Sequence, residues 1–85
     1  ITSANVVLLN SIKVYPNPVK DILNIQVPQN NEFKVSMKDL SGREMFRGTM
    51  TQTNHSIDVS GYSKGVYMLE ISNAFGSKVF RVIVD

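Results

Sequence analysis

The chain has 85 residues and a mass of 9.5 kDa, which is the size of one small domain. A hydrophobic fraction of 42% excludes a disordered chain, and the longest apolar runs, 6–9 and 66–69, are far shorter than the roughly 20 residues of a membrane-spanning helix. The net charge is +2, with nine basic and seven acidic residues scattered along the chain, so no nucleic-acid-binding patch is predicted.

Alternation of apolar and polar residues predicts a series of short β-strands. The alternating stretches are, in chain order, 12–14, 23–27, 33–38, 56–59, 66–71 and 78–84. The stretch 66–71 is the densest and predicts a central strand with Tyr67, Leu69 and Ile71 on one face. Residues 6–9 fit either an added edge strand or a linker, so the sequence predicts a linker or edge strand over 1–11 and a folded domain over 12–85.

Turn-forming residues separate the predicted strands. Ser41 and Gly42 predict a tight hairpin in which glycine supplies a positive φ. Residues 73–77 predict a longer hairpin loop, and residues 60–65 predict a loop that crosses between sheets. No window shows a helical stripe. The pattern therefore predicts an all-β fold, an antiparallel immunoglobulin-like β-sandwich of about seven short strands.

Two segments, 39–42 and 58–61, share the order aspartate, apolar residue, serine, glycine. We interpret both as strand exits, where the carboxylate accepts hydrogen bonds from the local backbone and glycine adopts the left-handed conformation. The alternative is a calcium site, which needs roughly six to eight oxygen ligands, and the sequence has no Asp-x-Asp-x-Asp spacing.

The residues needed for catalysis or metal binding are sparse. The chain has no cysteine, and His55 is its single histidine, which we interpret as a surface residue between Asn54 and Ser56. The acidic residues are well separated along the chain, so a carboxylate pair would have to come from distant strands. We predict no enzyme, no metal site and no cofactor. Asn54, His55 and Ser56 also form a glycosylation sequon, which arises easily by chance.

Four short motifs follow one another along the chain: a Tyr-Pro-Asn-Pro entry, an Asp-x-x-Gly hairpin, a Gly-x-Tyr strand start and a final basic-apolar strand. Their residues are Tyr15, Pro16, Asn17, Pro18, Asp39, Gly42, Gly65, Tyr67, Lys78 and Arg81. In this order and spacing they resemble the C-terminal sorting domain of type IX (Por) secretion system substrates, type A. The resemblance covers about residues 12–85.

The resemblance implies that this chain is a transport address. Domains of that family follow an N-terminal cargo domain that has already crossed the inner membrane, and an outer-membrane translocon recognises them. A sortase-like protease then usually removes them. The implied location is therefore the cell surface or extracellular space of a Gram-negative bacterium, reached through the periplasm. The chain would be a substrate in that chemistry, with no catalytic residues and no cofactor.

Each motif also has a local structural role. The prolines stiffen a corner, Gly42 closes a hairpin, and Gly65 frees the backbone before Tyr67, whose ring can pack inward while its hydroxyl reaches a backbone group. As recognition determinants, the exposed Asn17, Lys64, Lys78 and the terminal strand are therefore better candidates than core residues.

Two further expectations concern the edges and the end of the chain. Exposed edge strands offer docking by strand addition, and they also allow self-association to a homodimer, with residues 6–9 as the leading unsatisfied segment. Members of the family commonly finish with a lysine or a short basic-apolar ending, whereas this chain finishes with Asp85, so either the native chain continues by a residue or two or this member tolerates an acid there.

Two alternative functions fit the same fold. The first is an immunoglobulin-like adhesion or spacer module, which would have further domains after it. The second is a carbohydrate-binding module, which predicts at least two coplanar exposed aromatic rings. The available aromatic residues are Tyr15, Phe33, Phe46, Tyr62, Tyr67, Phe75 and Phe80.

Overall fold

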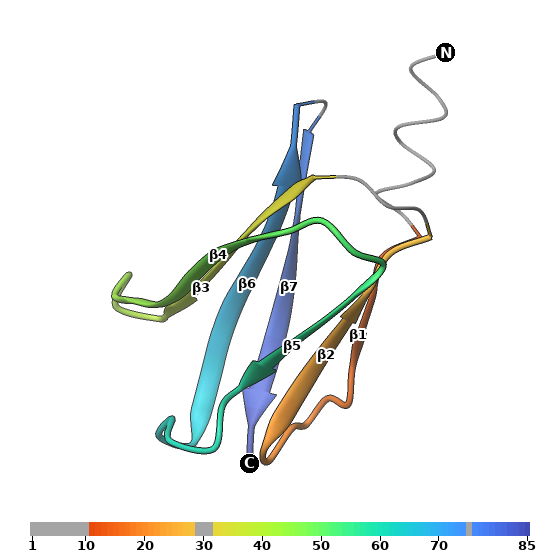
Figure 1. Ribbon diagram of the computed structural model, residues 1–85. Helices are drawn as coiled ribbons and strands as arrows, with labels where there is room; N and C mark the ends of the chain where they lie inside the picture. Colours follow the sequence, from red (N-terminus) through yellow and green to blue (C-terminus); the bar gives the residue numbers. More distant parts are fainter. Residues whose placement is uncertain (1–10, 29–31, 75) are drawn as a thin grey trace.

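The computed structural model describes residues 11–28, 32–74 and 76–85, and they form the all-β domain that the sequence predicts (Figure 1). The strands are β1 (Lys13–Tyr15), β2 (Ile22–Gln26), β3 (Phe33–Asp39), β4 (Glu44–Met50), β5 (Asn54–Asp58), β6 (Gly65–Asn73) and β7 (Gly76–Val84). The described residues contain no helix long and apolar enough to cross a membrane. The predicted edge strand or linker at 6–9 lies outside the described residues.

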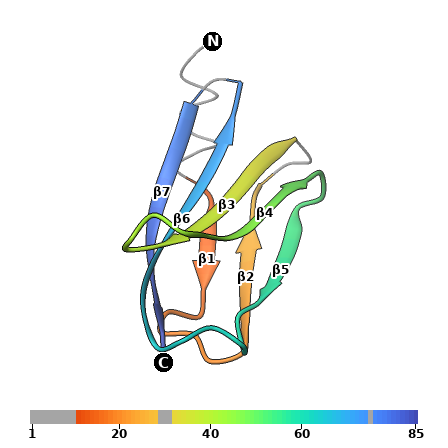
Figure 2. The ribbon, with the colours of Figure 1, turned by 90° about the vertical axis from the view of Figure 1, so that its left-hand side faces the viewer.

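The strands form two antiparallel sheets. The smaller sheet has the order β1-β2-β5, and the larger has the order β4-β3-β6-β7. Figure 2 shows β7 at one side of the domain, with β6 and β3 following it across the larger sheet. The segment between β5 and β6 connects the two sheets, which confirms the predicted crossing loop.

The core fills the space between the two sheets and follows the predicted alternation. Tyr67, Leu69 and Ile71 of β6 are all buried, which confirms their shared inward face. The side chains of Leu23 and Ile25 on β2 are also fully buried and are part of the same core cluster. Burial of these side chains removes apolar surface from water, which is the main stabilising contribution in a domain of this size.

Strand β4 is the one that alternation did not outline. Its register with β3 shifts between Met37 and Lys38, as a β-bulge requires. Two consecutive residues, Met45 and Phe46, are half-buried, so the period of two is interrupted there. Gly48 then provides room for the Phe46 ring, because a Cβ on Gly48 would lie 3.1 Å from Cζ of that ring.

The hairpin between β6 and β7 is tighter than the predicted loop over residues 73–77. Asn73 pairs directly with Gly76, so the strands continue almost to the tip. The amide nitrogen of Gly76 donates a hydrogen bond of 3.1 Å to Oδ1 of Asn73. The Asn73 side chain thereby stabilises the turn, which is shorter than the loop that the sequence predicts.

Candidate functional site

The Tyr-Pro-Asn-Pro motif forms a corner that touches the last strand. β1 ends at Tyr15, and Nδ2 of Asn17 then donates a 2.8 Å hydrogen bond to the carbonyl of Arg81. Oδ1 of Asn17 accepts a 3.0 Å hydrogen bond from the amide of Ile83. The side-chain amide of Asn17 therefore bonds β7 as the backbone of a neighbouring strand would. Pro16 and Pro18, on either side of it, both follow cis peptide bonds.

Backbone hydrogen bonds extend this contact beyond the side chain. The amide of Val19 donates to the carbonyl of Ile83 at 2.8 Å, and the amide of Asp85 donates to the carbonyl of Val19 at 2.8 Å. Val19 and Val84 form a parallel bridge, and Val19 is fully buried. We call residues 17–19, together with their hydrogen bonds to residues 81–85, the clasp. The clasp encloses the final part of β7 between two neighbours.

The sheet register brings the other motifs to this same end of β7. Asp39 pairs with Tyr67, and Tyr67 pairs with Val82, so three strands meet in one transverse row. Gly65 pairs with Val84, next to the clasp. Asn17, Gly65 and Tyr67 therefore lie beside residues 81–85, while Asp39 is separated from β7 by β6. Lys78 lies towards the other end of β7, opposite Ile71.

Asp39 organises the hairpin between β3 and β4. Its Oδ1 accepts hydrogen bonds from the Ser41 hydroxyl at 2.6 Å, the Ser41 amide at 2.9 Å and the Arg43 amide at 2.9 Å. The Ser41 hydroxyl, helped by the backbone amides and the Arg43 guanidinium, lowers the pKa of the Asp39 carboxyl below its ordinary value. Gly42 has a φ of +93°, which confirms the predicted role of glycine in this turn.

Asp58 repeats this arrangement at the exit of β5. Its Oδ1 accepts hydrogen bonds from the Ser60 hydroxyl at 2.7 Å and the Ser60 amide at 2.9 Å, and these bonds lower the pKa of the Asp58 carboxyl. Gly61 does not have a positive φ, so the predicted left-handed glycine is wrong at this second turn. Both carboxylates serve their own turns, and the described residues contain no cluster of three or more metal-ligating side chains.

Gly65 and Tyr67 behave as the motif predicts. Gly65 has a φ of +151°, a conformation that other residues rarely adopt. The Tyr67 ring is buried, and its hydroxyl donates a 2.6 Å hydrogen bond to the carbonyl of Ser63. Its ring centroid lies 5.4 Å from that of Tyr62, whose hydroxyl donates to the Met45 carbonyl at 3.3 Å. Burial, followed by the nearby Tyr67 and Asp58, raises the pKa of Tyr62.

The predicted recognition residues differ in how far their side chains are exposed to solvent. Tyr15, Lys64 and Arg81 are exposed, while Lys78 is half-buried and its Nζ lies 5.5 Å from the centroid of the Phe80 ring. Asn17 is exposed as expected, but both polar atoms of its amide bind β7. The sequence does not indicate that the Asn17 amide binds β7, because a contact between residues 64 or more positions apart produces no local sequence pattern.

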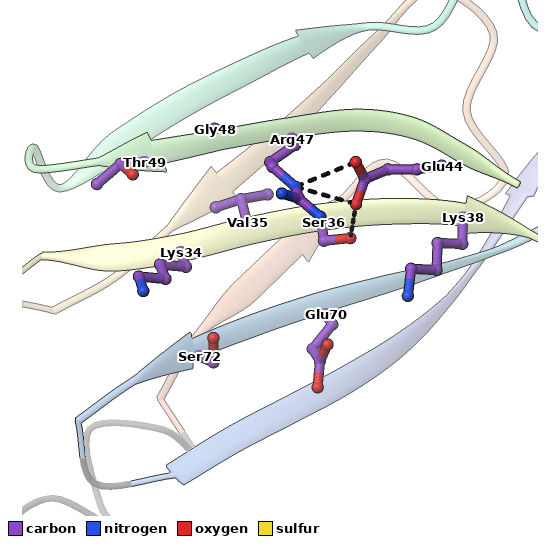
Figure 3. A pocket seen from close by; sticks show the side chains of 10 residues that line it. All are labelled: Lys34, Val35, Ser36, Lys38, Glu44, Arg47, Gly48, Thr49, Glu70 and Ser72. Carbon is purple, nitrogen blue, oxygen red and sulfur yellow. Dashed lines mark hydrogen bonds and ion pairs between the residues drawn. The ribbon is translucent and has the colours of Figure 1, made fainter. Parts of the chain in front are cut away.

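A hollow of about 560 Å³ lies on the outer face of the larger sheet, which the sequence did not predict for so small a domain (Figure 3). Glu44 and Glu70 stand on β4 and β6, with β3 between them. Glu44 is bound by Nε of Arg47 at 3.1 Å and by the Ser36 hydroxyl at 3.3 Å. The strand between them separates the two backbones by roughly 10 Å. The hollow is a solvent-facing sheet surface whose charges largely compensate one another.

His55 and the aromatic residues contribute mainly to packing. His55 is half-buried, not on the surface as predicted, because it faces the sheet interior opposite Ile25. Its ring centroid lies 6.0 Å from that of Phe46. Among the described aromatic residues only Tyr15 is exposed, at 44%, so these residues offer no platform of paired rings for a carbohydrate. Phe75 lies outside the described residues.

These features define an immunoglobulin-like all-β sandwich in which the Tyr-Pro-Asn-Pro and Gly-x-Tyr motifs lie beside the last strand. The model of the family described as "Secretion system C-terminal sorting domain" matches residues 13–85. The chain belongs to this family, the C-terminal sorting domain of the type IX (Por) secretion system. It is therefore a sorting-signal domain, and export to the cell surface or extracellular space follows from this membership.

Two relatives carry a similar stretch. A protein of Zobellia galactanivorans named β-agarase D is 38% identical over 73 residues, covering 86% of this chain and 14% of the relative. A protein of Formosa agariphila named endo-acting ulvan lyase is 25% identical over 81 residues, covering 94% of this chain and 16% of the relative. The chain thus spans only a small part of the length of both relatives.

A solved structure has the same fold. It is that of PorZ of Porphyromonas gingivalis, described as an essential bacterial surface component of the type-IX secretion system. The TM-score is 0.82 at 24% sequence identity, over 98% of this chain and 12% of that one. This likeness confirms the predicted immunoglobulin-like sandwich.

Proposed function

We propose that this domain directs an attached cargo protein from the periplasm of a Gram-negative bacterium through the type IX outer-membrane translocon. In this proposal a sortase-like protease then removes the domain, which itself has no catalytic role and needs no cofactor. The observation that carries the proposal is the family match over residues 13–85, together with the contacts of Asn17, Gly65 and Tyr67 with the end of β7.

We divide the predicted site residues into two groups. The first group stabilises turns and buried contacts and affects recognition only indirectly, by supporting the sheet that contains β7. Its members are Asp39, Gly42, Gly65 and Tyr67. Tyr15, Lys78 and Arg81 present side-chain atoms that make no hydrogen bond to another described residue, and we assign them to recognition. Asn17 belongs with the first group, since the clasp occupies its amide.

The proposal is tested by fusing residues 1–85 to a reporter directed to the periplasm, in a bacterium that has the secretion system. We expect the reporter outside the cell or on its surface. The matched control is the same strain without its translocon, where the reporter should remain periplasmic. Retention of the reporter in the wild-type strain would contradict the proposal.

A companion variant deletes residues 78–85. We expect export to stop, but this deletion also removes most of β7, so circular dichroism must show whether the sheet survives. The substitutions Arg81→Gln and Tyr15→Ala are better probes of recognition, since both side chains are exposed. We expect each to reduce export while the thermal unfolding midpoint stays near that of the wild type. A homodimer through an edge strand other than β7 is a further proposal, checked by the mass of the purified chain in solution.

A further inference from the structure

The clasp divides the outer edge of β7 into a closed half and an open half. In the closed half, Arg81, Ile83 and Asp85 direct backbone groups away from β6 and towards the clasp. Backbone groups alternate in direction along a strand, so Ser77 and Val79 must direct theirs away from β6 as well. No hydrogen bond joins these groups to another described residue. The open half of β7 is therefore the stretch from Gly76 to Phe80.

This stretch is better suited to strand addition than the edges of β1 and β4. β1 has three residues, while β5 and the open half of β7 each have five. β4 pairs with β3 through a bulge and carries the paired charges of Glu44 and Arg47. Natural edges are protected by short length, bulges, prolines and charges. The open half of β7 contains neither a proline nor a bulge, and it is protected by the inward-pointing charge of Lys78, which an acid of a partner would neutralise.

The side chains beside the open half set the chemistry of a partner. On the outer face, Val79 is 51% exposed, and Met68 of β6 is 37% exposed. Lys78 lies on the inner side, opposite the buried Ile71, and Arg81 lies on the outer side. The ion pairs of the described residues use Arg43 and Arg47. Lys78 and Arg81 are thus two cations without an acidic partner among the described residues.

We propose that the open half of β7 is a docking edge for an extended segment of another protein with the order acid, apolar, apolar, acid. A residue paired with β7 lies on the same face as the residue opposite it. The first acid would stand opposite Lys78, and the apolar residues opposite Val79 and Phe80. Because Asn17 occupies the edge at Arg81, the last acid would lie just beyond the paired stretch and bind the exposed Arg81 side chain on the outer face. The order reads the same in either direction, so it suits a parallel or an antiparallel segment. That the partner belongs to the secretion machinery rests on the proposed function.

A second copy of this chain is a poorer occupant. If two β7 strands paired about Val79, Lys78 of each copy would stand opposite Phe80 of the other. The two Lys78 side chains would then be diagonal neighbours on the same face, roughly 7–8 Å apart. Like charges at that position disfavour the copy, while an acidic segment gains from the same lysine. The charges of β7 therefore select for a different partner.

The test uses the full chain, labelled for nuclear magnetic resonance, and a synthetic eight-residue peptide with the core Glu-Val-Val-Glu flanked by threonines. A standard interface buries about 800 Å² on each partner, and this contact buries far less. We therefore expect a dissociation constant of roughly 1 mM. The amides of Ser77 and Val79 should shift and exchange more slowly with solvent. A matched peptide with the core Lys-Val-Val-Lys should bind roughly tenfold more weakly, because cross-strand charge pairs become repulsive.

Two variants identify the surface. The double substitution Lys78→Glu with Arg81→Glu should reverse the preference, so that the lysine peptide binds more tightly. Val79→Pro removes the outward amide while Lys78 and Phe80 keep their pairing with β6, and it should abolish binding of both peptides. Three results would overturn the proposal. The two peptides could bind with equal affinity, or the chemical-shift changes could centre on β4. The chain could also dimerise through Val79 while showing no preference for the acidic peptide.

The reporter fusion separates this inference from the sorting role. If the wild-type fusion is exported and the folded double charge variant is exported equally well, the docking edge is wrong and the sorting role stands. If the wild-type fusion itself stays in the periplasm, the sorting role fails, and the peptide titration alone decides the binding chemistry of β7.

Discussion

Asn17 and Ile83 lie 66 positions apart in the sequence, and the amide of Ile83 donates a 3.0 Å hydrogen bond to Oδ1 of Asn17. With the second bond from Nδ2 to the Arg81 carbonyl, one side chain connects the first corner of the domain to its last strand. The motif that precedes β2 therefore acts on a strand it does not neighbour in the sequence. Four predictions concern this contact and the turns that hold β7.

Asn17→Ala should lower the free energy of unfolding by about 1–3 kcal/mol, because two backbone groups of β7 lose their partner. Urea denaturation of the purified chain measures this change. Asn24→Ala is the matched control, since Asn24 makes a single exposed hydrogen bond, accepted from Ser56 at 3.1 Å. It should cost less than about 1 kcal/mol. Equal losses for the two variants would contradict a special role of the clasp.

Gly65→Ala should destabilise the domain by about 1–3 kcal/mol through backbone strain alone. A Cβ at Gly65 would meet no heavy atom within 4 Å, but alanine rarely adopts its φ of +151°. Gly61 is equally open and has no positive φ, so Gly61→Ala should be neutral or stabilising by about 0.4–1 kcal/mol. Thermal unfolding of both variants separates the two cases. Similar midpoints would show that the conformation of Gly65 carries no cost.

Tyr67→Phe should cost about 0.5–1.5 kcal/mol, because the 2.6 Å hydrogen bond to the Ser63 carbonyl is lost while the ring keeps its packing. Tyr62→Phe removes a longer bond of 3.3 Å and should cost less. Chemical denaturation followed by circular dichroism gives both values. A larger loss for Tyr62→Phe would mean that the hydroxyl of Tyr67 does not fix the loop between β5 and β6.

Acid should weaken the domain through Asp39 and Asp58. The pKa of each carboxyl is lowered from 3.8 in the folded state, so its contribution to stability is present above that value. This contribution decreases as the pH falls below 3.8, and it is lost once the pH passes below the folded pKa. Denaturation curves collected across this range should show decreasing stability.

Ser41 and Ser60 provide the internal controls for this pH dependence. Ser60→Ala should raise the pKa of Asp58 towards 3.8 and leave that of Asp39 lowered, whereas Ser41→Ala should do the reverse. A carboxyl titration followed by nuclear magnetic resonance reads both residues in one experiment. If neither serine variant changes its neighbouring aspartate, the hydroxyl hydrogen bonds are not the cause of the shift.

Local patterns in the sequence predicted the strands whose residues alternate strictly. Leu23 and Ile25, and likewise Leu69 and Ile71, fall on the buried face because the period of a strand is two. β4 escaped this reasoning, since its bulge places Met45 and Phe46 side by side and Gly48 adds no side chain. A register shift depends on the neighbouring strand, which alternation along one segment does not describe.

The site was predicted as a set of motifs but not as an arrangement. The predicted roles of Gly42 and Tyr67 are confirmed, because turns and inward-facing rings depend on nearby residues. The sequence does not indicate that the Asn17 amide binds β7, and it predicts a surface position for His55, which faces inward. Both features depend on contacts across strands, whose pairing is fixed only when the sheets assemble.

The enclosure of residues 81–85 also sets how the domain resists mechanical load. β6 lies along one side of this segment and the clasp along the other, with hydrogen bonds directed across the strand. A force pulling β7 along its length, as threading into a narrow pore would apply, loads these bonds together in shear. The open half, from Gly76 to Phe80, is held on one side only, so a pull from the hairpin tip would break its hydrogen bonds one after another. The same strand therefore resists a force applied at its C-terminal end more strongly than a force applied at the hairpin.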